Sequence, residues 1–156
     1  MSIQIFTSYF YQVRFMSPHM VPMSTAFSDP KWFRGVHKDK KGVYNGLRAP
    51  VFAPGPKCEG LCYGPKNCSH LNASTECPFL STYRKQLQEL NYNDIISRIE
   101  RLSYYIKDLE KFDEEPIAIL LVHEAPNNPC SERQIIQEWF AANNHPITEW
   151  TKNCGC

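Results

Sequence analysis

The chain has 156 residues, of which 42% are hydrophobic and 21% are charged, and its formal net charge is +1. This length and composition predict a single globular domain, residues 1–156. A charge so close to zero excludes a uniformly basic nucleic-acid-binding surface, although a local basic patch is still compatible with it. No segment approaches the ~20 apolar residues of a membrane span. The first sixteen residues also lack a basic leader and a cleavage site, so we expect a cytoplasmic protein of a bacterial cell or of a phage-infected host.

The first half of the chain predicts strands separated by ordered loops. Residues 3–15 are rich in β-forming side chains and predict a first strand, and a short second strand is expected around residues 23–26. Residues 31–41 mix basic and aromatic side chains, which is typical of a surface loop. Residues 44–66 contain four prolines and four glycines, a density that excludes a helix or a central strand.

The second half begins with helical periodicity. Apolar side chains recur every three or four residues between 79 and 90, and again between 95 and 109, which predicts two amphipathic helices. Asn93 or Asp94 offers an N-cap for the second helix. Residues 114–116, which include a proline, are expected to end it.

A continuous apolar run and a last helix complete the pattern. Residues 117–122 (IAILLV) show no polar alternation, as in a strand that is buried on both faces of a parallel sheet. Ser131 and Gln134 predict a capping box at the start of a helix, which the asparagines at 143–144 end, and residues 147–150 suit a final strand. This order predicts an α/β fold, with a mostly parallel sheet flanked by helices in a Rossmann-like, three-layer arrangement.

Seven cysteines are present, and an odd number argues against a disulfide framework. Thiolates and imidazole are the usual zinc ligands, and four of them can stabilise a Pro/Gly-rich segment that lacks its own core. We therefore expect residues 50–78 to form a metal-binding insertion that holds zinc. An iron–sulfur cluster and a set of independent thiols are the alternatives. The candidate ligands are Cys58, Cys62, Cys68, His70 and Cys77, with a C-terminal cysteine, Cys154 or Cys156, as a further candidate.

A second candidate site lies where the strand at 117–122 gives way to the next helix. Ligands of open α/β sheets bind beyond the carboxyl ends of the strands, and a helix N-terminus attracts phosphate or carboxylate groups. We expect Ser131 and Arg133 to bind such an anion. The helix dipole favours a thiolate at Cys130, and His123 and Glu124 are candidate acid–base groups, so these three are the candidate catalytic residues. The alternative is a helix cap, a surface arginine and a loop cysteine without function. The opposite wall of the site is expected to contain Ser24, Ser28, Lys31 and Trp32.

Four stretches of the chain carry a family resemblance: STAFSDPKWF at 24–33, RAPVFAP at 48–54, YRKQL at 83–87 and, most specifically, IAILLVHE followed by SERQIIQEWF within 117–140. In these stretches the chain resembles the prokaryotic and phage family called domain of unknown function 488. Members open the last of these helices with Cys-His-Arg. Arg133 matches this arginine, whereas Ser131 and Glu132 stand at the Cys-His positions and Cys130 lies one residue early. The resemblance implies an α/β fold with a pocket at the strand-to-helix turn, and a phage-like, viral protein, but it carries no activity.

Three functions fit these features. The first is a binder of, or an enzyme acting on, a phosphate-bearing small molecule such as a nucleotide or nucleoside derivative, with Trp32 either stacking on the base or packing inside the protein. The second is a non-catalytic protein that sequesters a signal or blocks a host protein, which the altered Cys-His pair favours. The third is nucleic-acid binding or modification through basic residues interleaved with aromatic ones. The residues of this third hypothesis are Lys31, Arg34, Lys38, Lys40, Lys41 and Arg48, with Trp32, Phe33 and Tyr44.

Overall fold

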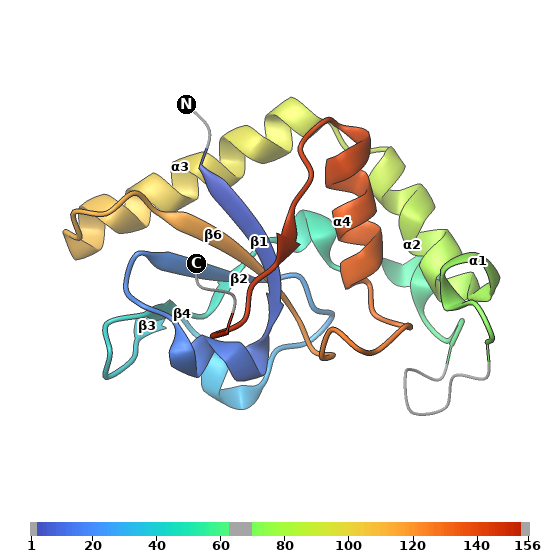
Figure 1. Ribbon diagram of the computed structural model, residues 1–156, viewed down its shortest axis with the longest axis horizontal. Helices are drawn as coiled ribbons and strands as arrows, with labels where there is room; N and C mark the ends of the chain where they lie inside the picture. The colour runs from blue at the N-terminus through green and yellow to red at the C-terminus, as the bar shows by residue number, and fades with distance from the viewer. Residues whose placement is uncertain (1–2, 63–69, 154–156) are drawn as a thin grey trace.

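A five-stranded parallel sheet forms the centre of the computed structural model, which describes residues 3–62 and 70–153 (Figure 1). Within the described residues, every strand pair of this sheet is parallel. The predicted α/β class with a mostly parallel sheet is therefore confirmed. In spatial order the strands are β5 (Leu47–Arg48), β2 (Met20–Ser24), β6 (Ile117–Val122), β1 (Gln4–Tyr9) and β7 (Thr148–Glu149).

The apolar run predicted as a buried strand is β6, and it occupies the middle of the sheet. It pairs with β1 from Ile117 to Val122 on one side and with β2 on the other. Its side chains alternate between two hydrophobic cores, because Leu120 belongs to one core and Ile119 and Leu121 to the other. Burial on both faces explains why this strand shows no polar alternation.

The two faces of the sheet carry different layers. The larger core joins the sheet to four α-helices, and the smaller core joins it to 3-10 helices and loops. In the described part of the chain, the three-layer arrangement thus has its α-helices on one face of the sheet (Figure 1). The helices of the first layer are α1 (Ala73–Glu76), α2 (Pro78–Gln88), α3 (Tyr92–Glu110) and α4 (Arg133–Ala142). The other short elements are the 3-10 helices η1 (Phe10–Phe15), η2 (Lys31–Phe33), η3 (Pro50–Phe52) and η4 (Pro56–Cys58), and the antiparallel hairpin of β3 (His37–Lys38) and β4 (Tyr44–Asn45).

The predicted first strand, residues 3–15, is wrong in its second half. The strand ends at Tyr9, and the chain continues as η1. The apolar side chains of Phe10 and Val13 are buried in the smaller core, which they could not reach from an extended chain leaving the sheet. Packing of the second face therefore overrides the β-propensity of these residues.

Two predicted helix caps also differ from the structure. The N-cap of α3 is Asn91, whose side chain accepts a hydrogen bond from the backbone N–H of Asp94 at 3.0 Å, so neither Asn93 nor Asp94 caps this helix. The capping box of α4 does not form, because Gln134 donates to the carbonyl oxygen of Pro129 instead. The predicted end of α4 is confirmed by Asn143 at its C-cap.

No helix in the part of the chain that the structure describes is both long and apolar enough to cross a lipid bilayer.

Candidate functional site

The carboxyl ends of the five parallel strands all lie at one edge of the sheet, where ligands of open α/β folds bind. The segment that follows β6 carries His123 and Glu124 and leads into α4. The segment that follows β2 carries Ser28, and its carbonyl oxygen lies 2.5 Å from Nε2 of His123. The order of the strands in the sheet therefore brings His123 and Ser28, which are 95 positions apart in the chain, into contact.

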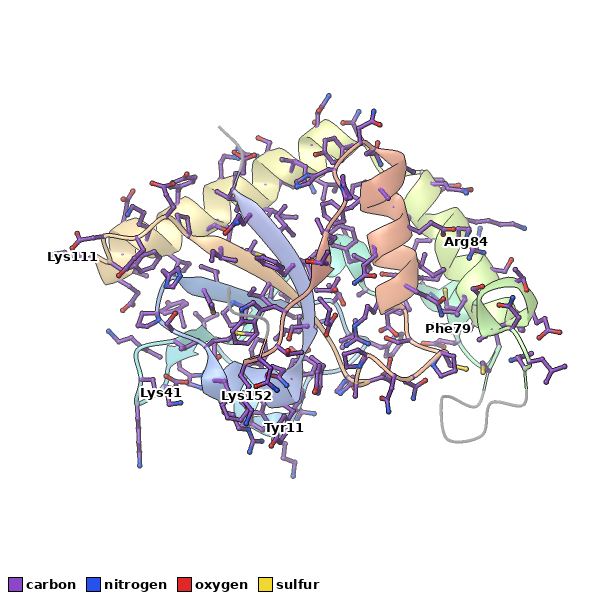
Figure 2. All side chains as sticks on the ribbon, in the orientation of Figure 1. Tyr11, Lys41, Phe79, Arg84, Lys111 and Lys152 are labelled. Atoms are coloured by element: carbon purple, nitrogen blue, oxygen red, sulfur yellow. The ribbon has the colours of Figure 1, made fainter. Side chains whose placement is uncertain are left out.

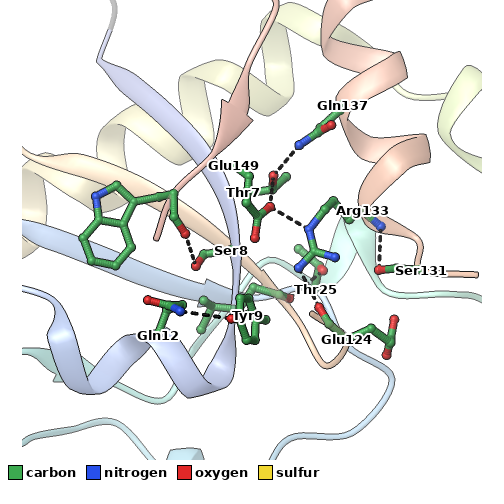
Figure 3. Close-up of polar contacts among 12 residues, drawn as sticks. Thr7, Ser8, Tyr9, Gln12, Thr25, Glu124, Ser131, Arg133, Gln137 and Glu149 are labelled. Atoms are coloured by element: carbon green, nitrogen blue, oxygen red, sulfur yellow. Dashed lines mark hydrogen bonds and ion pairs between the residues drawn. The ribbon is translucent and has the colours of Figure 1, made fainter. Parts of the chain in front are cut away.

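Arg133 is the centre of a buried polar network at this edge (Figure 3). It is 5% exposed, and its Nε donates to Oε1 of Glu149 at 2.6 Å while Nη2 donates to the carbonyl oxygen of Glu124 at 2.6 Å. The hydroxyl of Thr7 donates to the same Glu149 oxygen at 2.8 Å and accepts from Gln137 at 2.7 Å. Most of the charge on Arg133 is thus neutralised within the protein.

Three buried atoms of this network have no hydrogen-bond partner among the described residues: Nη1 of Arg133, Oε2 of Glu149 and Oε1 of Glu124. An unpaired buried polar group costs about 1–3 kcal/mol, so partners for these atoms would stabilise the fold. Two of the three atoms are carboxyl oxygens. The carboxyl oxygens accept hydrogen bonds and the guanidinium nitrogen donates them, so pairing all three atoms takes both donors and acceptors.

Glu132 and Glu124 form a pair of carboxyl groups beside α4. Glu132 is only 8% exposed. Burial, followed by the charge of Glu124, raises the pKa of Glu132 from 4.5 to about 7, although Arg133 acts in the opposite direction. A carboxyl group with such a pKa can both give and take a proton near neutral pH.

Glu132 lines a cavity of about 320 Å³. His123 lies on the same wall, and its Nε2 must carry the proton because a carbonyl oxygen only accepts. In the neutral ring Nδ1 then carries no hydrogen and can accept a hydrogen bond. The cavity is lined by Phe27, Ser28, Pro54, Gly55, Cys58, Glu59, Gly60, Cys62, Phe79, His123 and Glu132.

Cys62, His70 and Cys77 form a group that could hold a metal ion. One ligand atom from each lies within 4.8 Å of the others, and Cys77 is buried at the start of α2. Burial raises the pKa of the Cys77 thiol, and the neighbouring Cys62 adds to this effect. Ligands on a tetrahedral zinc ion stand about 3.8 Å apart, so a shift of about 1 Å would close the group around an ion.

The other predicted metal ligands have different positions. Cys58 is 2% exposed and lies outside this group, with its Sγ 3.8 Å from Oε1 of Gln86. Burial raises the pKa of the Cys58 thiol. Cys68, Cys154 and Cys156 lie outside the described residues.

The predicted ligand-binding residues divide between two places. Ser28 lines the cavity of Glu132, whereas Trp32 lines a different cavity. Ser24 donates to Asp29, and Lys31 is exposed in η2. The hydroxyl of Ser131 accepts from the backbone N–H of Arg133 at 3.1 Å.

Cys130 is buried, and its backbone N–H donates to Asn128 at 2.9 Å. Its sulfur is disulfide-bonded, so the thiolate predicted at Cys130 is wrong for this structure, because a disulfide sulfur carries no thiolate. The catalytic roles of His123 and Glu124 stay predictions.

Two residues of this region were not expected from the sequence. The sequence marks Glu132 only as a departure from a Cys-His pair, although a carboxyl group at the N-cap of a helix that follows a buried strand is a usable signal. Glu149 gave no such signal, because it reaches Arg133 only through the pairing of β7 with β1.

Comparison with known proteins adds no relative: no family model, no curated protein and no solved structure matches this chain.

Proposed function

We propose that the protein binds zinc through Cys62, His70 and Cys77, and that a small polar molecule binds in the adjoining cavity, where the Glu132 carboxyl group exchanges a proton with it. One observation carries this proposal: Cys62 belongs both to the metal-ligand group and to the lining of the cavity that contains Glu132. A molecule in that cavity would therefore lie between a metal centre and a buried acid.

The choice of zinc follows from the ligands. Two thiolates and one imidazole suit zinc, and catalytic zinc sites commonly use three protein ligands and a water or substrate in the fourth position. A bound zinc ion supplies Lewis acidity and lowers the pKa of water. Among the residues of this chain, Glu132 would exchange a proton with the ligand, and His123, which lines the same cavity, would contact it.

The charged groups in and near the cavity indicate which class of ligand it binds. Glu132 and Glu124 lie near the start of α4, and Arg133 is engaged with Glu149. The described lining of the cavity contains two carboxyl groups, Glu59 and Glu132, and neither lysine nor arginine, which favours a neutral or cationic ligand. The phosphate-bearing ligand expected from the sequence stays a prediction here, as does the resemblance to the family called domain of unknown function 488. A non-catalytic role in host interaction also stays a prediction.

The metal part is tested by elemental analysis of protein purified without chelator. We expect about one zinc ion per chain, lost in Cys62→Ser and Cys77→Ser. Cys58→Ser is the matched control, because Cys58 is a buried cysteine outside the group and should leave the zinc content unchanged. Wild-type protein without zinc, or loss of zinc only in the control, would contradict the assignment.

The ligand part is tested on the same preparations by mass spectrometry of small molecules released on denaturation. We expect a neutral or cationic compound that Ser28→Tyr excludes, because the larger side chain would fill the cavity. Glu132→Gln should retain the compound more weakly. Recovery of a phosphorylated compound would instead support the ligand class predicted from the sequence, and recovery of nothing would leave the zinc site without a role in small-molecule binding.

A further inference from the structure

A second cavity, of about 370 Å³, lies outside the site described above. Its walls come from η1, η2 and the β3–β4 hairpin, which belong to three separate stretches of the chain. The lining includes no cysteine and no glutamate. It consists of Phe10, Val13, Arg14, Trp32, His37, Asp39 and Asn45.

The aromatic wall of this cavity is Trp32. Its ring meets Phe10 at 6.3 Å and Phe33 at 5.7 Å, both edge to face, and these contacts fix its orientation. Trp32 nevertheless stays 48% exposed, whereas Phe33 is fully buried. An indole ring that is held in place by neighbouring rings and is half exposed to solvent is suited to stack on a planar base.

Asn45 supplies a polar group inside the cavity. It is 2% exposed, and its Oδ1 has no hydrogen-bond partner among the described residues. Its Nδ2 makes only a long contact of 3.4 Å to Asp39. A buried carbonyl oxygen without a partner favours a ligand that donates an N–H group, as the edge of a nucleobase does.

Positive charge lies on one side of the cavity, because Arg14 lines it and Lys41 donates to the carbonyl oxygen of Arg14. Arg14 lies over the ring of Tyr11 at 4.1 Å, and Figure 2 shows Tyr11, Lys41 and Lys152 at the same end of the molecule. The one carboxylate in the lining, Asp39, accepts from two backbone N–H groups of its own turn. The exposed cations of η1, η2, the hairpin turn and the C-terminal segment are Arg14, Lys31, Arg34, Lys40, Lys41 and Lys152.

Two of the basic residues expected to contact nucleic acid form ion pairs with acidic side chains of this chain. Lys38 forms an ion pair with Glu110 at 2.6 Å, and Arg48 forms one with Asp29 at 2.6 Å. Of the others, Lys31 lies beside Trp32 in η2, and Lys41 contacts Arg14, which lines the cavity together with Trp32. A local basic patch of this kind is compatible with a net charge of +1.

We propose that this second cavity binds one nucleotide of a single-stranded nucleic acid, with the base stacked on Trp32 and hydrogen-bonded to Asn45, and with neighbouring phosphates held by Arg14 and the lysines. A free nucleotide shares this chemistry. The cations continue beyond the cavity, however, and a strand would use more of them than a single phosphate group can. This inference does not depend on the zinc site or on Glu132.

The test is fluorescence anisotropy with a labelled single-stranded DNA 12-mer, its duplex, and unlabelled dAMP as competitor. Trp32→Ala should weaken binding of the single strand roughly 10- to 100-fold, as expected for the loss of one stacked base. Lys152→Gln should reduce the dependence of log Kd on log salt by about 0.7 if it contacts one phosphate. Tyr105→Ala, which removes another exposed aromatic ring, in α3, should leave binding unchanged.

Several results would overturn the proposal. They are equal affinity for duplex and single strand, absence of binding at low salt, and an affinity that does not change in Trp32→Ala. Competition by dAMP at concentrations equal to those of the 12-mer would assign the cavity to a free nucleotide instead. Lys152→Gln changes an exposed side chain, so it keeps the test valid if Trp32→Ala does not fold.

Discussion

Replacing Glu132 with glutamine should make the protein more stable at pH 8 and leave its stability nearly unchanged at pH 4. The pKa of Glu132 is about 7 in the fold against an ordinary value of 4.5, mainly because the group is buried. The folded state therefore holds a proton on Glu132 that the unfolded chain loses. This contribution to stability is fully present below pH 4.5 and is lost as the pH rises through about 7.

The magnitude follows from the pKa difference. At about 1.4 kcal/mol per pH unit, ionised Glu132 destabilises the fold by about 3 kcal/mol above pH 7. For a domain of this size that corresponds to a rise of roughly 6–12 °C in the Tm of Glu132→Gln at pH 8.

The assay is urea unfolding of wild-type protein and variant at pH 4, 6 and 8. The difference between the two proteins should grow with pH, because other titrating groups cancel in the comparison. Glu124→Gln is a second probe, since it removes the neighbouring charge that adds to the raised pKa and should reduce the pH dependence of wild-type stability. A difference that stays constant from pH 4 to pH 8, or a variant less stable than wild type at pH 8, would refute the assignment of a buried, proton-holding carboxyl group.

Three further predictions concern the fold. Asn91→Ala should cost about 1 kcal/mol of unfolding free energy because it removes the N-cap of α3, whereas Asn93→Ala should cost far less; equal losses in urea unfolding would contradict the cap. Arg133→Met should cost about 3–5 kcal/mol because it leaves Glu149 buried without its ion pair, and adding Glu149→Leu should recover most of the loss; a single-variant loss below about 1 kcal/mol would mean that the pair is screened. Leu120→Ala, at a fully buried position of β6, should cost about 2–5 kcal/mol by thermal or urea unfolding, and a smaller cost would show that the core closes around the missing methyl groups.

Local patterns in the sequence predicted the helices and strands in which the spacing of apolar residues matches the faces that are buried. The apolar run of β6 predicted a strand buried on both faces, and the spacing of apolar residues predicted α2 and α3. The cluster of thiols and imidazole likewise predicted a metal-ligand group, of which Cys62, His70 and Cys77 lie close together. These signals are local because side-chain period and ligand type can be read within one segment.

The tertiary structure determined the contacts and cavities that depend on which strands are neighbours in the sheet. The sequence could not show that Tyr9 ends β1, because β-forming residues continue beyond it. They form η1 because their side chains pack into the smaller core. The sequence also could not pair Arg133 with Glu149, nor place Ser28 and Trp32 in separate cavities. Such contacts join segments far apart in the chain, and their energy depends on which strands become neighbours, which no local period encodes.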